Sequence, residues 1–250
     1  MKGLQDTARF TKHALRAFRG RDVWQSAQIK CDRMMLGNQN ACWCICPRHL
    51  SASSVVYSIG VGEDISFDLA LIQQFGLQVH AFDPTPQCIE WLQGQTLPPG
   101  FVFHAHGVAG FDGNCAFMPP ENPSHVSHTI MPRSSSRPGI EVSMHRLGTI
   151  KRMLGHACID LLKMDIEGAE YDVIADMLTQ RIPVKQLLVE FHHRWPHIGV
   201  DMTKRAICQL NAAGYRVFDV APSGEEYSFK RRGVARSGRK PALDRPLPRK

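Results

Sequence analysis

The sequence has no apolar run of about 18 or more residues, the length that a membrane-spanning helix requires. Its N-terminus also lacks the short apolar core of a secretion signal, and no internal repeat divides the chain. These absences predict a protein that has no membrane span and is located in the cytoplasm.

The sequence has no cysteine pattern typical of a zinc site or a disulfide framework. Its eight cysteines stand in a chain without a signal peptide, which favours reduced thiols. Cys42, Cys44 and Cys46 in "ACWCICP" are alternate residues, closer together than usual zinc ligand pairs, and a second pair is missing. In an extended segment these thiols lie on one side of a strand, so we expect them to pack in a core or interface.

An excess of positive charge is confined to the C-terminal end. The formal net charge is +7, but residues 230–250 hold nine basic residues and one acid, which leaves 21 basic and 22 acidic residues before them. This segment is rich in proline and charge and poor in large apolar residues, so we expect a disordered tail. A weak contact with nucleic acid or acidic lipid is one interpretation of the tail, and a solvated tail without a partner is the other.

Residues 1–29 are expected to form an N-terminal extension with an amphipathic helix. Leu4, Ala8, Leu15 and Phe18 lie near one face of that helix, with basic residues around them. The helix either packs on the domain or lies on a membrane surface.

The remaining chain is long enough for one good-sized domain, expected over residues 30–229. From about residue 50, short apolar runs alternate with helical patterns, which predicts an α/β fold with a doubly wound, mostly parallel sheet. The expected strands are 55–60, 77–82, 100–108, 158–164 and 184–191. Next, "YRVFDV" and "EYSFKR" flank the turn "APSGE", so the sheet should end in an antiparallel hairpin. Residues 118–139, rich in Pro and Ser, are a candidate lid loop.

The stretch "SIGVGEDISF" follows the first of these strands and indicates a ligand site. Gly60 and Gly62 allow a sharp turn and a close approach of a ligand to the backbone. Asp83, at the end of the second strand, can accept both hydroxyls of a ribose. A dinucleotide fingerprint needs a third glycine where this chain has Ile65. Glu63 and Asp64 would also oppose a pyrophosphate, so a cationic cofactor fits better.

Four segments resemble, in order and spacing, the FkbM-type methyltransferases. They are "VVYSIGVGEDISFDLALI", "VHAFDPTPQCIEWL", "DLLKMDIEGAEYDVI" and "LLVEFHH". The resemblance covers about residues 30 to 230, and "MDIEGAEYDVI" is its most specific piece. It implies an S-adenosylmethionine-dependent enzyme with the class I methyltransferase fold, a Rossmann-like sheet of seven strands.

The residues that match imply a cofactor site at the ends of the strands. Gly60 and Gly62 would line the methionine part of the cofactor, and Asp83 would hold its ribose. The full set carried over is Gly60, Gly62, Glu63, Asp64, Asp83, Pro84, Thr85, Gly107, Val108 and Asp165.

Other residues in this set would contact the adenosine end and the methyl group of the cofactor. Pro84 and Thr85 would shape the adenosine pocket, and Gly107 and Val108 would flank the adenine. Asp165 would face the reactive methyl group. Many methyltransferases have an acid two residues before the first glycine, but this chain has Ser58, so the partner of the cofactor's ammonium group stays open among three acids: Glu63, Asp64 and Asp165.

The candidate catalytic residues are His192, Asp165 and Glu190. In "VEFHHRW", alternation places Glu190 and His192 on one side and His193 on the other. A histidine suits proton transfer near neutral pH, so we predict His192 as the base; an exposed histidine that binds a backbone group is the alternative. The three residues can also converge on a divalent metal, but we predict no metal ligands and name this only as an alternative.

The function expected from the resemblance is O-methylation of a hydroxyl on a sugar, glycan or small natural product. N-methylation is a close alternative. A nicotinamide-dependent oxidoreductase is a second class of enzyme, and a non-catalytic interaction module that acts through the basic tail is a third interpretation. The oligomeric state is not readable from the sequence.

Overall fold

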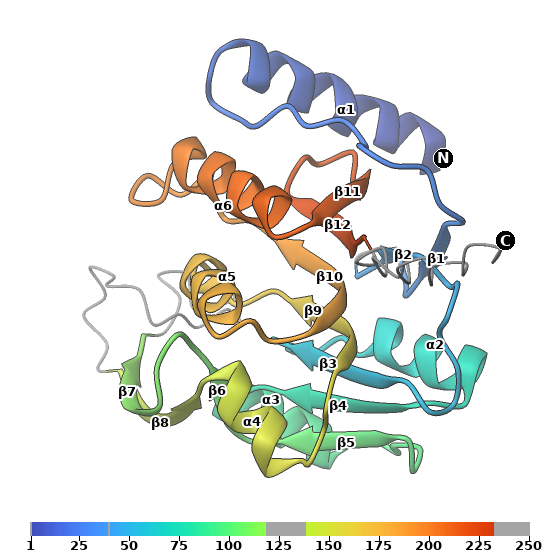
Figure 1. Ribbon diagram of the computed structural model, residues 1–250, viewed down its shortest axis with the longest axis vertical. Helices are drawn as coiled ribbons and strands as arrows, with labels where there is room; N and C mark the ends of the chain where they lie inside the picture. Colours follow the sequence, from blue (N-terminus) through green and yellow to red (C-terminus); the bar gives the residue numbers. More distant parts are fainter. Residues whose placement is uncertain (1, 40, 119–138, 233–250) are drawn as a thin grey trace, which may run out of the picture.

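The structure is a computed structural model that describes residues 2–39, 41–118 and 139–232. Its main sheet has seven strands in the order β11-β12-β10-β9-β3-β4-β5 (Figure 1). These strands are β3 (Val55–Ile59), β4 (Gln78–Phe82), β5 (Phe101–His104), β9 (Ile159–Met164), β10 (Val184–Glu190), β11 (Tyr215–Val220) and β12 (Glu226–Arg231). Neighbours from β5 to β10 are parallel, and β12 is antiparallel to both β10 and β11. The predicted α/β class, seven-stranded sheet and terminal hairpin are confirmed.

Strand order reverses at β3, which lies between β9 and β4 inside the sheet. The next strand along the chain, β4, pairs with one edge of β3, and β9 pairs with the other. In an open parallel sheet, such a reversal leaves a crevice beyond the carboxyl ends of the strands. The fold therefore places a ligand site where the glycine turn leaves β3.

Helices cover both faces of the sheet, because alternate residues of each strand point to opposite faces. Tyr57 and Ile59 pack in one core with α4 (Leu147–Met153), α5 (Glu170–Thr179) and α6 (Val200–Ala212). Val56 packs on the other face with α2 (Ser66–Phe75). The short α3 (Pro86–Gln93) packs beside α2 through Cys88 and Leu92.

A small hairpin of β1 (Met34–Leu36) and β2 (Trp43–Ile45) lies against the main sheet and carries the cysteine cluster. Cys44 and Cys46 are buried, as the alternation predicts. The backbone of Cys46 exchanges two hydrogen bonds with the side chain of Gln186 in β10, at 2.9 and 2.8 Å. These two cysteines pack in the core, whereas Cys42 lines the cavity described below.

The expected strand 100–108 is divided between two sheets. Its second half becomes β6 (Gly107–Val108), which joins β7 (Gly113–Phe117) and β8 (Ile140–His145) in a three-stranded sheet. The break comes at His106, whose backbone N–H donates to the carbonyl of His104 at 2.9 Å and turns the chain. Apart from Met118 and Gly139, the candidate lid loop lies outside the described residues.

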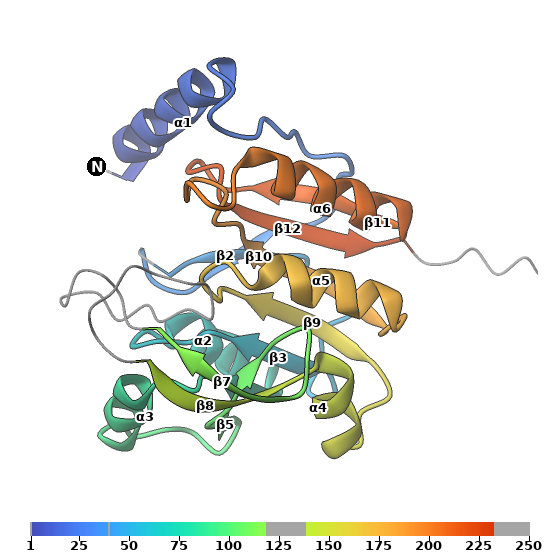
Figure 2. The ribbon, with the colours of Figure 1, turned by 90° about the vertical axis from the view of Figure 1, so that its left-hand side faces the viewer.

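The N-terminal helix α1 (Lys2–Phe18) lies beyond the β11–β12 edge of the sheet (Figure 2). Its buried His13 stacks on Trp24, and His13 Nε2 lies 2.9 Å from the carbonyl oxygen of Val23. Phe18 is 91% exposed, and Phe10 and Leu15 are also exposed. The helix is thus attached through one face and presents apolar side chains to solvent on another.

At the other end of the chain, the ordered strand runs further than expected. β12 ends at Arg231, so Lys230 and Arg231 belong to the sheet and not to the tail that was expected from residue 230. Lys230 Nζ lies 3.0 Å from the thiol sulfur of Cys46, and the Arg231 guanidinium lies over the ring of Tyr215. Lys230 and Arg231 thus both contact other residues of the folded domain. The rest of the predicted tail, from residue 233, lies outside the described residues.

Among the described helices, none combines the length and the apolar character that crossing a membrane would require.

A row of histidine rings packs beside the core at the β4–β5 edge. His80 Nδ1 lies 3.1 Å from His104 Nε2, and the ring of His156 meets His80 edge-on at 5.0 Å. His156 Nδ1 in turn lies 2.8 Å from the hydroxyl of Tyr57. Burial, together with the neighbouring His156 and His104, lowers the pKa of His80 to about 4.

This histidine row is expected to make the folded chain less stable in acid. The pKa of His80 in the folded chain lies below its ordinary value of about 6.5, so between these two values the unfolded chain binds more protons. The stability that the neutral His80 ring contributes is therefore complete above about 6.5 and is lost as the pH falls toward about 4. Across this pH window we expect the free energy of unfolding to fall by about 1 to 2 kcal/mol less in His80→Phe than in the wild type. Denaturant titrations of both proteins at several pH values measure the difference. Equal pH dependence in the two proteins would contradict it.

Candidate functional site

A cavity of about 380 Å³ opens at the carboxyl ends of β3, β4 and β9. The residues that the sequence nominated for cofactor binding all line it. They are Gly60, Gly62, Glu63, Asp64, Asp83, Pro84, Thr85, Gly107, Val108 and Asp165. Segments that lie about a hundred residues apart in the sequence therefore meet around one space.

The glycine turn owes its shape to two positive φ angles, +73° at Gly60 and +54° at Gly62. Gly60 donates its N–H to the carbonyl of Phe82 at 2.9 Å, which ties the end of β3 to β4. On the other side, the backbone of Asp165 passes so close to Gly60 that a Cβ there would overlap the Asp165 carbonyl oxygen. The turn thus lies between the ends of β4 and β9 with no room for a side chain at Gly60, so this position requires glycine.

Asp83 is held with its carboxylate toward this turn. Its Oδ2 accepts the N–H of Gly62 at 3.0 Å, and its Oδ1 accepts the N–H and the hydroxyl of Thr85 at 2.9 and 2.6 Å. The residue is only 6% exposed. These bonds use both lone pairs of Oδ1 and one of Oδ2, so a rigid acceptor with one free lone pair, on Oδ2, faces the cavity.

Two acids that follow the glycine turn have different roles. Asp64 Oδ1 accepts the N–H of Ser66 at 3.0 Å at the start of α2, and Oδ2 accepts the side-chain amide of Asn38 at 2.5 Å. Burial by itself raises the pKa of Asp64, but these bonds outweigh it and lower the pKa. Glu63 is exposed at the rim of the same cavity. Asp64 is thus occupied by the protein, and Glu63 is the better placed of the two to meet a ligand.

Lys163 is a cavity residue that the sequence interpretation missed. Its Nζ donates to the carbonyl of Gly60 at 2.5 Å and lies 5.6 Å from the centre of the Trp43 ring. Asp68 of α2, 2% exposed, lines the same end of the cavity. Burial raises the pKa of Asp68 to about 6, although the charge of Lys163 acts to lower it. A lysine within the apolar run "CIDLLKM" was the available signal.

The three candidate catalytic residues come together at the ends of β9 and β10. One ligand atom from each of Asp165, Glu190 and His192 lies within 4.8 Å of the others. His192 Nε2 lies 3.8 Å from Asp165 Oδ1 and 3.5 Å from Glu167 Oε2. This convergence is the one that the strand ends predict.

Glu170, the first residue of α5, orients the His192 ring. Its Oε1 lies 2.9 Å from His192 Nδ1 and accepts the N–H of Ile166 at 3.0 Å, while Oε2 accepts the N–H of Gly168 at 3.1 Å. Glu170 is fully buried. The acid that satisfies the start of this helix is therefore Glu170, whereas Glu167 faces His192.

The carboxylates around His192 control its protonation. Burial by itself lowers the pKa of His192, but Glu170, Asp165 and Glu167 outweigh it and raise the pKa to about 10. Burial and the charge of Asp165 raise the pKa of Glu190 well above its ordinary value. In this state His192 holds its proton at neutral pH. It can act as the predicted base only when another cation neutralises the surrounding carboxylates in place of the charged ring.

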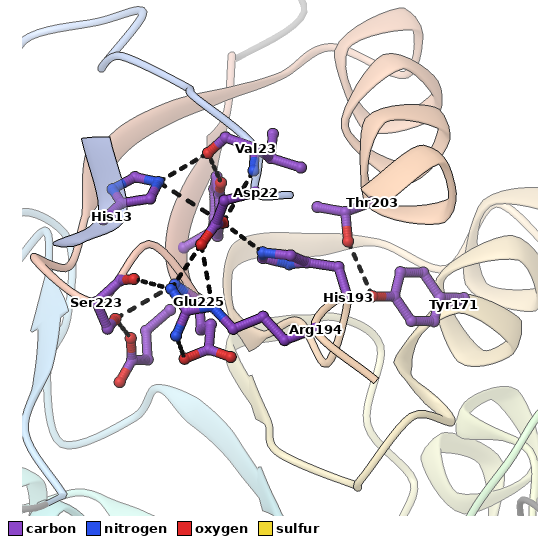
Figure 3. Close-up of polar contacts among 11 residues, drawn as sticks. His13, Asp22, Val23, Tyr171, His193, Arg194, Thr203, Ser223 and Glu225 are labelled. Atoms are coloured by element: carbon purple, nitrogen blue, oxygen red, sulfur yellow. Dashed lines mark hydrogen bonds and ion pairs between the residues drawn. The ribbon is translucent and has the colours of Figure 1, made fainter. Parts of the chain in front are cut away.

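His193 and Arg194 bind Asp22 of the N-terminal extension (Figure 3), whereas His192 faces Asp165 and Glu167. His193 Nε2 lies 2.6 Å from Asp22 Oδ1, and Arg194 donates to Asp22 Oδ2 through Nε at 3.0 Å and Nη2 at 2.7 Å. Arg194 also pairs with Glu225 and with the carbonyl of Ser223. The segment after α1 thus fixes the loop that carries His192.

Burial by itself raises the pKa of Asp22, but the bonds from His193 and Arg194 lower it to about 2. The charged form of Asp22 is therefore the form that the fold stabilises. Residues 1–29 were expected to be an extension whose helix packs on the domain or lies on a membrane surface, and Asp22 of this segment bonds to His193 and Arg194 of the domain.

Comparisons with known proteins find one matching family model and two similar curated proteins. The family model described as "Methyltransferase FkbM domain" matches residues 51–217. "Probable methyltransferase-like protein 24" of Rattus norvegicus is 27% identical over 157 residues, and the Homo sapiens protein of that name is 28% identical over 158. Each match covers 62% of this chain but only 37% of the relative. The chain thus corresponds to less than half the length of these curated relatives.

Two solved structures show weaker likeness. The methyltransferase FkbM of Methylobacillus flagellatus has a TM-score of 0.45 and 14% identity, over 72% of this chain and 44% of that one. Fibrillarin of Aeropyrum pernix, crystallised with natively bound S-adenosyl-L-methionine, has a TM-score of 0.42 and 8% identity, over 84% of this chain and 85% of that one. Since the family model matches well over half of the sequence, the chain belongs to the FkbM methyltransferase domain family.

Proposed function

We propose that this chain binds S-adenosylmethionine and transfers its methyl group to a hydroxyl of a sugar, glycan or small natural product. The observation that carries the proposal is the Asp83 carboxylate, fixed at 3.0 Å from the Gly62 N–H beside a cavity of about 380 Å³. A cavity of this size falls within the range of ligand pockets, and a fixed carboxylate is the group that holds ribose hydroxyls.

The charge of the cavity supports a cationic cofactor. Lys163 is the one Lys or Arg among its described lining residues, and its Nζ is engaged by the Gly60 carbonyl. The acids that line the cavity are Glu63, Asp64, Asp68, Asp83, Asp165, Glu167, Glu190 and Glu226. Such a surface attracts a sulfonium and an ammonium group and opposes the pyrophosphate of a nicotinamide cofactor.

The positions of the chain's own residues give each a role in this reaction. S-adenosylmethionine, when bound, supplies an electrophilic methyl group that an acceptor displaces in line. Asp83 and the glycine turn would hold the nucleoside and methionine parts, and Pro84, Thr85, Gly107 and Val108 would enclose the adenine end. Asp165, Glu190 and His192 would orient the acceptor hydroxyl, and His192 would take its proton only when a bound cation replaces the charge of the His192 ring.

Isothermal titration with S-adenosylhomocysteine, with NADH as the comparison, tests the proposal. We expect saturable binding of S-adenosylhomocysteine with a micromolar dissociation constant and none of NADH. Binding of NADH alone would favour an oxidoreductase. Binding of neither ligand would remove the cofactor site from the proposal and leave an interaction module on a methyltransferase fold.

A further inference from the structure

We propose that Asp165, Glu190 and His192 form a binding site for one divalent metal ion, and that Mn²⁺ suits this set of ligands. The site lies at the mouth of the proposed cofactor cavity, which Asp165 and Glu190 also line. Metal binding itself is independent of the proposed function. The role of the ion, to hold and acidify the acceptor hydroxyl, rests on that function.

The spacing of the ligand atoms fits one ion. Two atoms bound to the same ion at about 2.1 Å cannot lie more than about 4.2 Å apart. His192 Nε2 and Asp165 Oδ1 are 3.8 Å apart, within this limit. The three ligand atoms all lie within 4.8 Å of one another, so no pair exceeds this limit by more than about 0.6 Å.

His192 is held in the orientation that metal-binding histidines adopt. Its Nδ1 lies 2.9 Å from the buried Glu170, which two backbone N–H groups hold in place. This leaves Nε2 directed at the carboxylates of Asp165 and Glu167. A carboxylate behind the far nitrogen of a histidine fixes the tautomer and strengthens its bond to a metal.

Glu190 supplies a further observation, because its carboxylate is partly buried beside other acids. Within the described part of the chain it makes no hydrogen bond, Asp165 and Glu226 line the same cavity, and the His192 ring is the nearby group that can carry a counter-charge. Several carboxylates that are partly removed from water with one counter-charge are costly. A cation between Glu190 and Asp165 would remove that cost.

The ligand chemistry selects the kind of ion. Two carboxylate oxygens and one imidazole nitrogen favour a divalent ion of intermediate hardness such as Mn²⁺, and no thiol is within the group. Three protein ligands leave open positions on an octahedral ion for water and for the acceptor oxygen. An ion bound there polarises the O–H bond of the acceptor, whose proton then passes to a base or to water.

Electron paramagnetic resonance with the full chain and Mn²⁺ alone tests the site, since bound and free Mn²⁺ give different signals. We expect one saturable site per chain and a nitrogen coupling from His192 in the pulsed spectrum. Glu190→Gln and His192→Gln should each weaken binding about tenfold or more, with the nitrogen coupling lost only in His192→Gln. Thermal melting establishes that each variant is folded.

His145→Gln is the matched control. His145 also lies 3.8 Å from an aspartate oxygen, that of Asp112, but it belongs to no group of three ligands in the described residues. This variant should bind Mn²⁺ as the wild type does. Equal weakening in the control, absence of saturable binding at millimolar Mn²⁺, or absence of nitrogen coupling in the wild type would each overturn the site.

Titration with S-adenosylhomocysteine in the absence of metal separates this inference from the proposed function. Cofactor binding without Mn²⁺ binding would refute only the metal site. Mn²⁺ binding without cofactor binding would refute only the proposed cofactor.

Discussion

Replacing Asp83 with alanine is expected to weaken the binding of S-adenosylhomocysteine by about tenfold to a hundredfold. A ribose hydroxyl that donates to the free lone pair of Asp83 Oδ2 makes a charge-assisted hydrogen bond worth about 1.5 to 3 kcal/mol. The substitution also removes the acceptor of the Gly62 and Thr85 N–H groups, so the end of β4 loses part of its support. Calorimetric titration of the purified variant measures the change in affinity.

Asp112→Ala separates the loss of a ligand contact from the loss of support. Asp112 also accepts one backbone N–H, from Arg146 at 2.8 Å, and one threonine hydroxyl, from Thr149 at 3.0 Å, but it does not line the cavity. Because Asp112 is exposed and Asp83 is buried, we expect a smaller decrease in stability, about 0.5 to 1.5 kcal/mol, and unchanged affinity. If Asp83→Ala binds as tightly as the wild type, Asp83 does not hold the ribose.

The substitution Gly60→Ala is expected to destabilise the chain by about 4 kcal/mol or more, enough to leave little folded protein. The added Cβ would overlap the backbone carbonyl oxygen of Asp165, and a backbone atom cannot move aside without separating the ends of β3 and β9. The φ angle of +73° adds a smaller cost. Denaturant titration followed by circular dichroism measures the loss.

Gly62→Ala is the matched substitution two residues later. Gly62 also has a positive φ, but a Cβ there would meet nothing within 4 Å, so the expected cost in stability is about 1 to 2 kcal/mol. Because Gly62 lines the cavity, the same methyl group should obstruct the ligand and lower the affinity. Equal stability of the two variants would mean that the approach of Asp165 to Gly60 does not constrain the turn.

Much of the fold is readable from local patterns. The alternation of strands and helices, the final hairpin and the position of the glycine turn follow from periods of two and 3.6 residues and from turn signals. The patterns also marked Asp83 and Asp165, because each ends a strand, and parallel strands end at the same edge of a sheet. They missed the division of the segment 100–108 into β5 and β6, which depends on a turn at His106 and on pairing with β8.

The sequence by itself determined which strand-end residues reach the cavity edge, because the positions of strands and turns along the chain follow from local spacing. The tertiary structure alone decided which side chains meet there. Lys163 lies under the Gly60 carbonyl, 103 residues away, and Asp22 holds His193 across 171 residues. Glu170 fixes His192 across 22 residues, between a helix and the loop after β10. Such partners depend on how strands and helices pack. The repeat of apolar residues along one segment does not tell which side chain of another segment lies opposite it.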